Sequence, residues 1–304
     1  MVVACSGGAD SLALLAATVF EGRDGGWRVV GATVDHGLQP DSAARASRVV
    51  TQMASLGVAE TVGVRVSVEG GGLGPEAAAR RARYAVLDEV TQRFGAAAVL
   101  LGHTRDDQAE TVLLGLARGS GGRSLAGMRR SFDRYRRPLL DVGRADTVTA
   151  CQVEGIEYWD DPHNSDPRFL RSRVRTRVLP MLEEELGPGV AQTLARTAEQ
   201  LRADMDHLDT LAERALAALG DQLALAHLAA LPTVVRRRVL RLAALRAGAP
   251  AGELFHEHVL AVDALLTDWH GQKWIDLPGH LRVLRGSVGL EFVRHQGNPS
   301  CPTP

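Results

Sequence analysis

A short segment near the N-terminus, Ser6-Gly7-Gly8-Ala9-Asp10-Ser11, combines glycines, hydroxyls and one acid in a pattern that suits phosphate chemistry. It follows the apolar run Val2–Cys5 and precedes the apolar run Leu12–Ala17. A glycine-rich turn between a strand and a helix points backbone N–H groups inward, and the helix dipole there favours negative charge. Asp10 is compatible with a phosphate when a divalent cation lies between the two. The segment therefore predicts a magnesium–nucleotide site.

The same segment could also be an ordinary strand-to-helix turn in which Asp10 or Ser11 only caps the helix. It is not the Walker phosphate loop, because no Gly-Lys-Ser/Thr follows it and Lys273 is the only lysine in the chain.

A second chemical signal is His103-Thr104-Arg105-Asp106-Asp107-Gln108-Ala109-Glu110-Thr111, which follows an apolar run. One interpretation is helix capping, with the acids placed favourably against the helix dipole. The other is that His103, Asp107 and Glu110 form a metal-binding or acid–base set beside the phosphate loop. We favour the functional interpretation.

Two weaker signals are ambiguous by themselves. Asp35-His36-Gly37 follows the apolar strand Val29–Val34, and Asp35 could form a turn or bind a ligand. Arg80 and Arg83 share one face of the helix expected after Pro75 and could reach a phosphate or ribose. A solvated helix face, on which Arg80 forms an ordinary i,i+4 ion pair with Glu76, explains these arginines as well.

Arginines are clustered although the formal net charge is only −1. The clusters are 129–137, the series Arg168, Arg171, Arg173, Arg175 and Arg177, and the group Arg236, Arg237, Arg238, Arg241 and Arg246. No acid separates the arginines of the second series, which favours an anionic partner such as a phosphodiester. Nearby Tyr158, Trp159 and Phe169 could stack on an unpaired base or belong to the core.

Alternating short strand patterns and longer helical patterns must position these residues. We expect strands at Val2–Cys5, Arg28–Val34, Thr61–Val68 and Ala97–Gly102, with helices starting near Ser11, Pro40, Pro75 and Asp107. This pattern predicts an α/β fold, a parallel sheet with helices on both faces. Functional loops then lie at the carboxyl ends of the strands. Residues 119–137 are predicted to form a mobile loop.

The composition changes after Pro188, and helices are expected at Val190–Leu219, Thr233–Arg246 and Glu253–Asp268. Short alternating strands with hairpin turns are expected over Lys273–Val293. The predicted domains are 1–187, a catalytic domain, and 188–296, a helical linker with a small α+β C-terminal domain. Residues 297–304 are predicted to be a disordered tail.

Composition excludes several classes of protein. The three cysteines, Cys5, Cys151 and Cys301, are far apart and indicate neither a zinc site nor a disulfide framework. No apolar run reaches the ~18 residues of a membrane span, and no secretory signal is present. We therefore expect a cytoplasmic protein without a membrane partner.

These motifs together resemble the tRNA(Ile)-lysidine synthetases, a branch of the PP-loop ATP pyrophosphatases with a Rossmann-like fold. The resemblance runs from Val2 to about Pro180, and it is carried by Ser6–Ser11, Asp35–Gly37, Glu76 with Arg80 and Arg83-Tyr84, His103–Thr111, Arg118–Gly121, Leu125–Met128, Arg137–Leu140, and Asp161, Asn164 and Asp166 ahead of Arg171, Arg173 and Arg175. Ser124 and Ser172 replace a glycine and an asparagine that are usual in the family.

The resemblance implies a reaction and residue roles. MgATP would bind Ser6, Gly7, Gly8, Ala9, Asp10, Ser11 and His103, with Asp10 and Asp107 as magnesium ligands. The 2-carbonyl of the cytidine at the first anticodon position of tRNA(Ile) with a CAU anticodon would be adenylated. Free L-lysine would then displace AMP, which switches decoding from AUG to AUA. Asp35, Asp107 and Glu110 would bind or deprotonate the lysine ammonium.

For the tRNA, the resemblance implies that Arg173 contacts the activated base or α-phosphate. Arg80, Arg83, Arg118, Arg171 and Arg175 would bind the substrates or the tRNA backbone. A homodimer is possible. The chain starts almost on its first strand, whereas relatives carry a short leader, which leaves open a start upstream of Met1. With one small C-terminal domain, it is similar to the short form of the family.

Three other functions remain as alternatives. A tRNA thiolase of the same superfamily would need catalytic cysteines in the crevice. An ammonia-using synthetase would leave the arginine clusters unexplained. A non-catalytic nucleotide sensor would not need the acids of the 103–110 segment.

Overall fold

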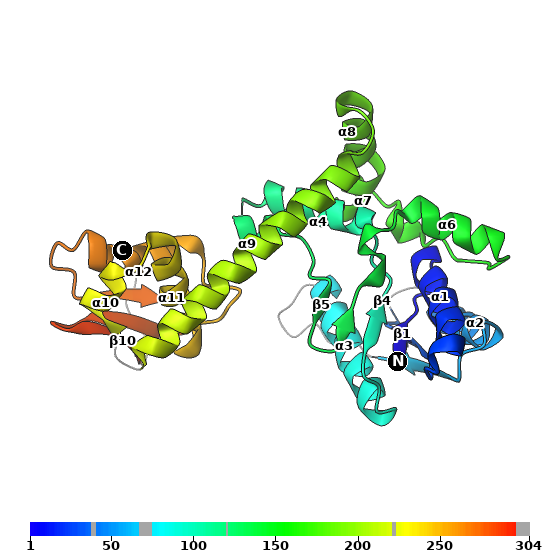
Figure 1. Cartoon of the computed structure of the whole chain (residues 1–304), viewed down its shortest axis with the longest axis horizontal. Coiled ribbons are helices and arrows are strands. Elements are labelled where there is room, and N and C mark those ends of the chain that lie inside the picture. The colour runs from blue at the N-terminus through cyan, green and yellow to red at the C-terminus, as the bar shows by residue number, and fades with distance from the viewer. Residues whose placement is uncertain (38–40, 67–74, 120, 221–222, 296–304) are drawn as a thin grey trace, which may run out of the picture. The chain divides into compact units, whose positions relative to one another are not determined.

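The structure is a computed structural model that describes residues 1–37, 41–66, 75–119, 121–220 and 223–295 (Figure 1). The chain divides into two compact units, Met1–Arg202 and Ala203–Pro304. The predicted domain boundary at 187/188 lies just before helix α9 (Val190–Leu219), whereas the division between the units falls within this helix. The predicted tail, 297–304, lies outside the described residues.

The first unit is built on a six-stranded sheet with the order β3-β2-β1-β4-β6-β5. Its strands are β1 (Val2–Ala4), β2 (Val30–Asp35), β3 (Glu60–Arg65), β4 (Val99–Leu101), β5 (Ser131–Phe132) and β6 (Tyr135–Arg136). All neighbouring pairs are parallel except β5 and β6. Val3 of β1 pairs with Gly31 of β2 on one side and Leu100 of β4 on the other.

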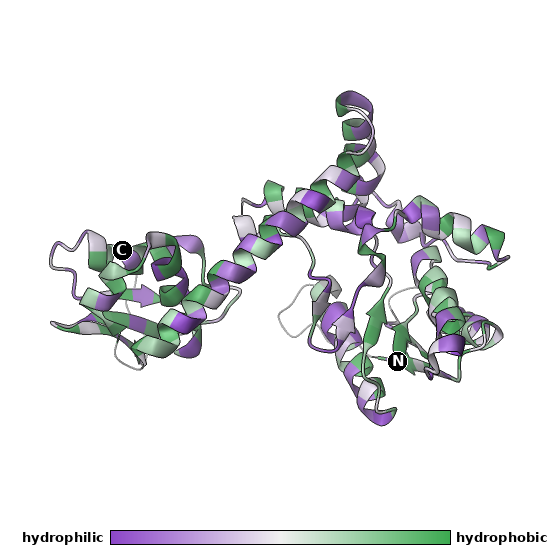
Figure 2. Cartoon of the chain, viewed as in Figure 1, coloured by the Kyte–Doolittle hydropathy of each residue, from purple (hydrophilic) through white to green (hydrophobic). Residues whose placement is uncertain are grey.

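Helices cover both faces of this sheet, which confirms the predicted α/β fold. The helical elements of the first unit are α1 (Ala9–Gly25), α2 (Ser42–Ser55), α3 (Pro75–Arg93), α4 (Arg105–Ala117), α5 (Gly122–Leu125), η1 (Pro138–Asp141), α6 (Arg144–Val153), η2 (Pro162–Asn164), α7 (Leu170–Arg173), η3 (Val174–Val178), α8 (Leu179–Leu186) and the first part of α9. Successive strand residues face opposite sides, so Val3 packs with α1, α2 and α6 while Val2 packs with α3. Figure 1 shows these two helical layers, and Figure 2 shows the apolar central strands between them.

The 119–137 segment differs from the predicted loop. Its described part contains the short helix α5 and the strands β5 and β6, and Tyr135 of β6 pairs in parallel with Val99 of β4. Tyr135 is buried, and its ring stacks on Phe132 with centroids 4.9 Å apart. The segment therefore extends the sheet. The sequence did not predict these strands, because two residues are too few to produce a detectable alternation of apolar and polar side chains.

The predicted helix starts shift by up to two residues where capping is visible. Helix α4 begins at Arg105 rather than Asp107, because Thr104 is its N-cap and the Asp107 carboxylate accepts the Thr104 N–H at 2.8 Å. Helix α1 begins at Ala9 rather than Ser11, with Gly8 as N-cap. Pro40 lies outside the described residues, and the helix expected there runs over Ser42–Ser55.

The second unit packs helices on a four-stranded antiparallel sheet with the order β7-β10-β9-β8. Its elements are the end of α9, β7 (Leu223–Ala224), α10 (Leu225–Ala230), α11 (Thr233–Arg246), α12 (His256–Thr267), β8 (Trp274–Leu277), β9 (Leu281–Arg285) and β10 (Gly289–Arg294). Leu216, Val239, Leu265 and Val283 are among the buried residues of its core. This arrangement confirms the predicted small α+β domain.

Most arginines of the cluster on α11 are engaged in contacts within the second unit. Arg236 and Arg237 both bind the buried carboxylate of Asp263, at 2.6 and 2.8 Å, and Arg238 binds Asp209 at 3.1 Å. Arg241 donates to the Leu254 carbonyl. These arginines hold α11 against its neighbours, so they contribute to packing within the unit.

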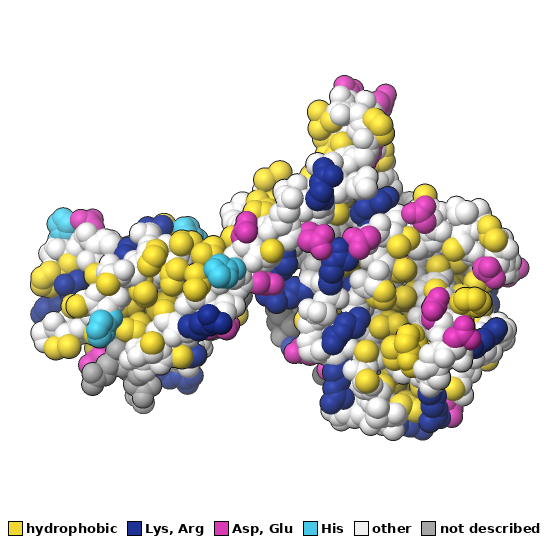
Figure 3. Space-filling model, viewed as in Figure 1, with side chains coloured by type: hydrophobic (Ala, Val, Ile, Leu, Met, Phe, Trp, Pro, Cys, Tyr) yellow, Lys and Arg dark blue, Asp and Glu magenta, His cyan; other side chains and the backbone are white. Residues whose placement is uncertain are grey.

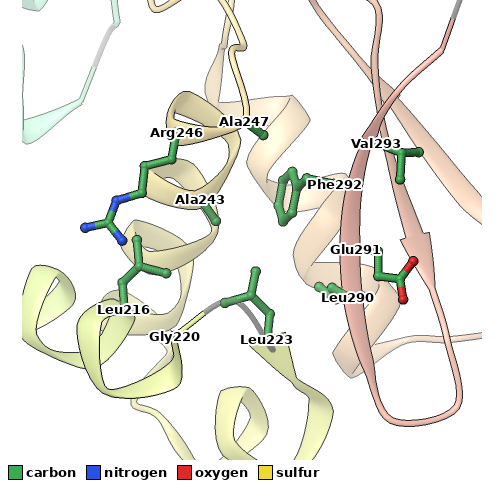
Figure 4. A pocket seen from close by; sticks show the side chains of 10 residues that line it. All are labelled: Leu216, Gly220, Leu223, Ala243, Arg246, Ala247, Leu290, Glu291, Phe292 and Val293. Atoms are coloured by element: carbon green, nitrogen blue, oxygen red, sulfur yellow. The ribbon is translucent and has the colours of Figure 1, made fainter.

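The second unit also has an open pocket of about 440 Å³ between α9, α11 and β10. Most of the residues that line it are apolar, including Leu216, Ala243 and Phe292, and Arg246 and Glu291 lie on opposite sides of it (Figure 4). In the described part of the chain, no helix has the length and hydropathy needed to cross a membrane.

Candidate active site

The phosphate loop and the 103–110 segment meet where the strand order changes direction. The chain runs outward from β1 through β2 to β3, then returns to place β4 on the other side of β1. In such sheets, ligands bind at the carboxyl ends of the two strands that flank this switch point. A Cβ on Gly102, just after β4, would lie only 3.0 Å from the Asp10 carbonyl oxygen. The two segments are therefore in direct contact.

The loop after β1, Ser6–Ser11, is held in shape by serine hydrogen bonds. Gly7 has φ +85°, and a Cβ at this position would lie 2.6 Å from Cγ2 of Val49. Only glycine avoids both the strained backbone and the clash. The Ser11 hydroxyl donates to the Gly8 carbonyl at 2.9 Å and accepts the Ser6 N–H at 3.1 Å. These bonds fix the loop at the N-terminus of α1, where anions bind favourably.

Two buried acids of α4 face this loop. Asp107 accepts the Thr104 N–H on one oxygen and two arginine guanidinium groups on the other. Burial opposes its charge, but Arg144 and the Thr104 N–H more than compensate and lower the Asp107 pKa below its ordinary value. Glu110 is 0% exposed and is bonded to guanidinium groups on both oxygens. The structure therefore brings Asp107 and Glu110 together, one helical turn apart.

Arg144, at the first position of α6, binds three acids at once. Its Nη2 lies 2.8 Å from Oδ1 of Asp107, its Nη1 3.3 Å from Oε1 of Glu110, and its Nε 3.4 Å from Oδ2 of Asp10. Arg144 belongs to none of the sequence motifs that predicted the site. A cation at a helix N-terminus is unfavourable to the helix dipole, and this was the one available signal that Arg144 needs acidic partners.

The last four arginines of the 168–177 series are two residues apart, so on a helix they point to more than one face. Arg171 and Arg175 bind Glu110, at 3.0 and 2.7 Å, and Arg175 also reaches Asp107 at 3.1 Å. Arg173 instead donates to the Pro167 carbonyl at 2.7 Å and braces the preceding turn. Arg175 lies in the π-helical segment η3, a type of distortion that is frequent at functional sites.

Asp35 lies at the end of β2, with different partners from Asp107 and Glu110. One of its oxygens accepts the Gly37 N–H at 2.9 Å, and Arg65 lies 3.7 Å from the other. Burial would raise its pKa, but the bonds from Gly37 and Ser42 and the charge of Arg65 lower the Asp35 pKa overall. This acid is therefore ionised at neutral pH.

His103 lies between Asp107 and a basic group that includes Arg83 and Arg137. Nδ1 of His103 accepts from Nε of Arg137 at 3.2 Å, and burial lowers the pKa of His103 to about 3. The imidazole is consequently neutral, with its proton on Nε2. Arg83 Nε and His36 Nδ1 are both buried without a hydrogen-bond partner. Unpaired buried donors and acceptors of this kind are costly and are typical of ligand sites.

The two remaining predicted residues, Arg80 and Arg118, are exposed. Arg80 is exposed and donates to the Tyr84 hydroxyl at 3.3 Å. Arg118 is exposed at the C-terminal end of α4. On the face drawn in Figure 3, basic and acidic side chains of the first unit are interspersed, in keeping with the near-neutral total charge.

The predicted magnesium ligands have suitable chemistry but are bridged by a guanidinium. Asp10 and Asp107 supply hard oxygen donors, and Mg²⁺ commonly uses one or two carboxylates together with substrate phosphates. Within the described ranges, no three acidic, histidine or cysteine side chains converge tightly enough to hold a metal by themselves. The two carboxylates thus fit a metal that the nucleotide's phosphates help to coordinate.

Comparison with known proteins identifies the family. The profile described as a PP-loop domain matches residues 1–182, and the profile described as a TilS substrate binding domain matches residues 223–297. The tRNA(Ile)-lysidine synthase of Streptomyces coelicolor is 54% identical over 303 residues, which cover 98% of this chain and 85% of that protein. This chain belongs to the tRNA(Ile)-lysidine synthase family. The Thermobifida fusca member is also 54% identical, over 94% of this chain and 89% of that protein.

A solved structure outside the tRNA(Ile)-lysidine synthase family shares the fold. The U34-tRNA thiolase NcsA from Methanococcus maripaludis, solved with its [4Fe-4S] cluster, matches with a TM-score of 0.53 and 17% identity, over 66% of this chain and 72% of that chain. In this chain, Cys5 and Cys151 are both buried and neither forms a disulfide. Cys301 lies outside the described residues.

Proposed function

We propose that this chain joins the ε-amine of free lysine to C2 of the cytidine at the first anticodon position of tRNA(Ile) with a CAU anticodon. The enzyme is an ATP-dependent tRNA-modifying ligase, as the family match over both units indicates. The observation that carries the residue-level proposal is that Arg144 joins Asp10 of the loop after β1 to Asp107 and Glu110 of α4, at one switch point of the sheet.

In the first step, the cytidine 2-carbonyl oxygen attacks the α-phosphorus of ATP, and pyrophosphate leaves. Negative charge grows on the α-phosphate and on the leaving group. The N–H groups of the Ser6–Ser11 loop and the α1 dipole are oriented to stabilise it. We assign Mg²⁺ to Asp10 and Asp107, where it would neutralise phosphate charge.

In the second step, the lysine amine attacks C2, and AMP leaves with the former 2-carbonyl oxygen. The ammonium must lose its proton before it can attack. We assign the binding of this ammonium to Asp107 and Glu110, which requires the arginines that now contact these carboxylates to move aside. Asp35 supplies a further ionised carboxylate at the neighbouring strand end. The adjoining basic group, which includes Arg83 and Arg137, suits the anionic part of a substrate.

The arginine roles are revised by their positions. Arg171 and Arg175 hold Glu110, so we propose that they act on the acid cluster rather than on the tRNA backbone. A role for Arg173 on the activated base requires its guanidinium to leave the Pro167 carbonyl. Arg80 and Arg118, both exposed, remain candidates for tRNA phosphates.

The deciding experiment follows labelled lysine into unmodified tRNA(Ile) with a CAU anticodon. We expect incorporation that depends on ATP and is matched by released pyrophosphate. Methionine tRNA with the same anticodon letters is the control. Pyrophosphate release without label in the tRNA would contradict lysine as the nucleophile, and label without ATP would contradict the adenylation step. Sedimentation of the purified protein tests whether it forms a homodimer.

Site variants test the residue assignments. Asp107→Asn and Glu110→Gln are each expected to reduce lysidine formation by about 10²–10⁴-fold, because each removes a carboxylate that binds or deprotonates the amine. Glu60→Gln is the matched control, since Glu60 pairs with Arg28 in an exposed ion pair on β3. Circular dichroism should show an intact fold. Normal turnover in a folded Asp107→Asn protein would remove Asp107 from the site.

A further inference from the structure

Arg144 occupies the oxygens that a metal ion would need. Asp10 uses one carboxylate oxygen to accept the Thr147 hydroxyl, and its other oxygen faces Nε of Arg144 at 3.4 Å. Asp107 uses one oxygen for Thr104, and its other oxygen lies 2.8 Å from Nη2 of Arg144. In each carboxylate, one oxygen is held by a threonine and the other faces the same guanidinium. The guanidinium therefore lies directly between the two predicted magnesium ligands.

The attachment of Arg144 lets its side chain move while its backbone stays fixed. Its N–H donates to Oδ2 of Asp106 at 2.7 Å, which holds the start of α6 to α4. Its side chain is 25% exposed, and its contacts with Asp10 and Glu110, at 3.4 and 3.3 Å, are longer than a strong charge-assisted bond. The guanidinium can thus leave the carboxylates without unfolding either helix.

We propose that Arg144 is a positioning residue that serves as a built-in counter-cation for Asp10, Asp107 and Glu110 and is exchanged for the metal ion. Asp10, Asp107 and Glu110 would repel one another at a partly buried position if no cation lay between them. Arg171 and Arg175 contact the acids of α4, and Arg144 is the described arginine that also contacts Asp10. Arg144 therefore keeps the loop after β1 in register with α4. A divalent ion that coordinates Asp10 and Asp107 must displace Arg144 from both acids and Arg175 from Asp107, so Arg144 weakens metal binding by competition.

This inference rests on the proposed function only for the identity of the cation, and it is tested without tRNA, lysine or ATP. The probe is Mn²⁺ alone, a hard octahedral ion that substitutes for Mg²⁺ on oxygen ligands and is detected by electron paramagnetic resonance. The full-length wild-type protein is compared with Arg144→Gln. Arg28→Gln is the matched control, because Arg28 pairs with an exposed glutamate at 3.0 Å outside the site.

Arg144→Gln is expected to bind Mn²⁺ about tenfold more tightly than wild type. The apparent affinity rises with the fraction of molecules in which no guanidinium of residue 144 contacts Asp10 and Asp107, and the substitution increases that fraction. Arg28→Gln should match wild type. Without metal, Arg144→Gln should melt at a lower temperature than Arg28→Gln, and Mn²⁺ should raise its melting temperature more than that of wild type. In an Asp10→Asn background, the Arg144→Gln change should give a smaller gain in affinity.

Equal or weaker Mn²⁺ binding by Arg144→Gln would overturn the exchange, while measurable binding by wild type would leave the metal assignment intact. Absence of binding in both proteins would overturn the exchange, because removing Arg144 would then not free the two carboxylates to hold a metal without the nucleotide's phosphates. If Arg144→Gln fails to fold, Arg144→Lys decides the question, because a compact ammonium bridges fewer carboxylates than a guanidinium. A folded Arg144→Lys protein that binds Mn²⁺ no more tightly than wild type would also refute the proposal.

Discussion

Asp107 shows that capping a helix and belonging to a reactive site are not exclusive at the scale of one residue. Its two oxygens have separate tasks: one accepts the N–H and hydroxyl of Thr104, and the other accepts Arg144 and Arg175. The cap fixes the direction of the carboxylate, so the arginines find it in one orientation. A purely local interpretation of the sequence treats these tasks as competitors, whereas the structure combines them.

His103 predicts a pH dependence of stability at this same scale. Burial lowers its pKa to about 3, compared with 6.5 for an ordinary histidine. Between these values the unfolded chain binds a proton that the folded protein does not, so stability falls as the pH drops from about 6.5 toward 3. His103→Asn should remove this loss, which amounts to as much as about 1.4 kcal/mol per pH unit.

Urea unfolding at pH 7.5, 6.0 and 5.0 measures this difference between wild type and His103→Asn. His270→Asn is the control, because the His270 side chain is 71% exposed. The control should follow the wild-type dependence. Parallel pH dependences for all three proteins would mean that His103 titrates normally in the folded state.

The sequence located the acids of the site better than it located their partners. Asp10, Asp107 and Glu110 stand in motifs next to strand ends, so their position followed from the parallel sheet. Arg144 stands in an unremarkable stretch before α6, and only the tertiary structure brings it to those acids. Likewise, the spacing of Arg171, Arg173 and Arg175 predicts side chains on more than one helix face, but it does not predict which of them contacts Glu110.

At the scale of elements, the phosphate loop predicts a sharp difference between its two glycines. Gly7→Ala should destabilise the protein by about 2 kcal/mol or more, because its φ of +85° strains any other residue and its Cβ would meet Val49 at 2.6 Å. Gly8→Ala is the matched control, because the nearest atom to its Cβ lies at 3.7 Å and its φ is −81°. Thermal unfolding should separate the two variants.

A second change distinguishes the two causes of the Gly7 effect. In a Val49→Ala background the clash is removed while the backbone strain remains. Gly7→Ala should therefore lower the free energy of unfolding less in that background than it does in the wild-type protein. An equal loss in both backgrounds would assign the whole effect to the backbone. A Gly7→Ala protein as stable as Gly8→Ala would contradict the loop geometry.

Elements with long periodic patterns were predictable from the sequence, and short ones were not. The bounds expected for α9 and α11 agree with the structure, because many apolar residues repeat with helical period in each. Strands β5 and β6 have only two residues each, and their pairing depends on β4, which is distant in sequence. The packing role of the basic cluster on α11 could not be predicted, because Asp263, the acid that binds Arg236 and Arg237, lies on another helix.

At the scale of the whole molecule, the two units have separate apolar cores. The core around Val239 and Val283 draws only on the second unit, whereas the cores around Val3 and Val2 draw only on the first. Separate cores favour separate unfolding transitions. The chain is therefore expected to melt in two steps, and a substitution inside one core should move only one of them.

Asp263→Asn tests this independence in the second unit. The change leaves Arg236, whose side chain is 8% exposed, without its buried carboxylate, and breaking such a pair costs about 3–5 kcal/mol. In a unit of this size the loss corresponds to a decrease of roughly 10 °C or more in one calorimetric transition. Asp276→Asn, which breaks the exposed pair with Arg282, should shift it little. The other transition, and nucleotide binding by the first unit, should stay unchanged. A single transition that moves as a whole would mean that the two cores unfold as one cooperative unit.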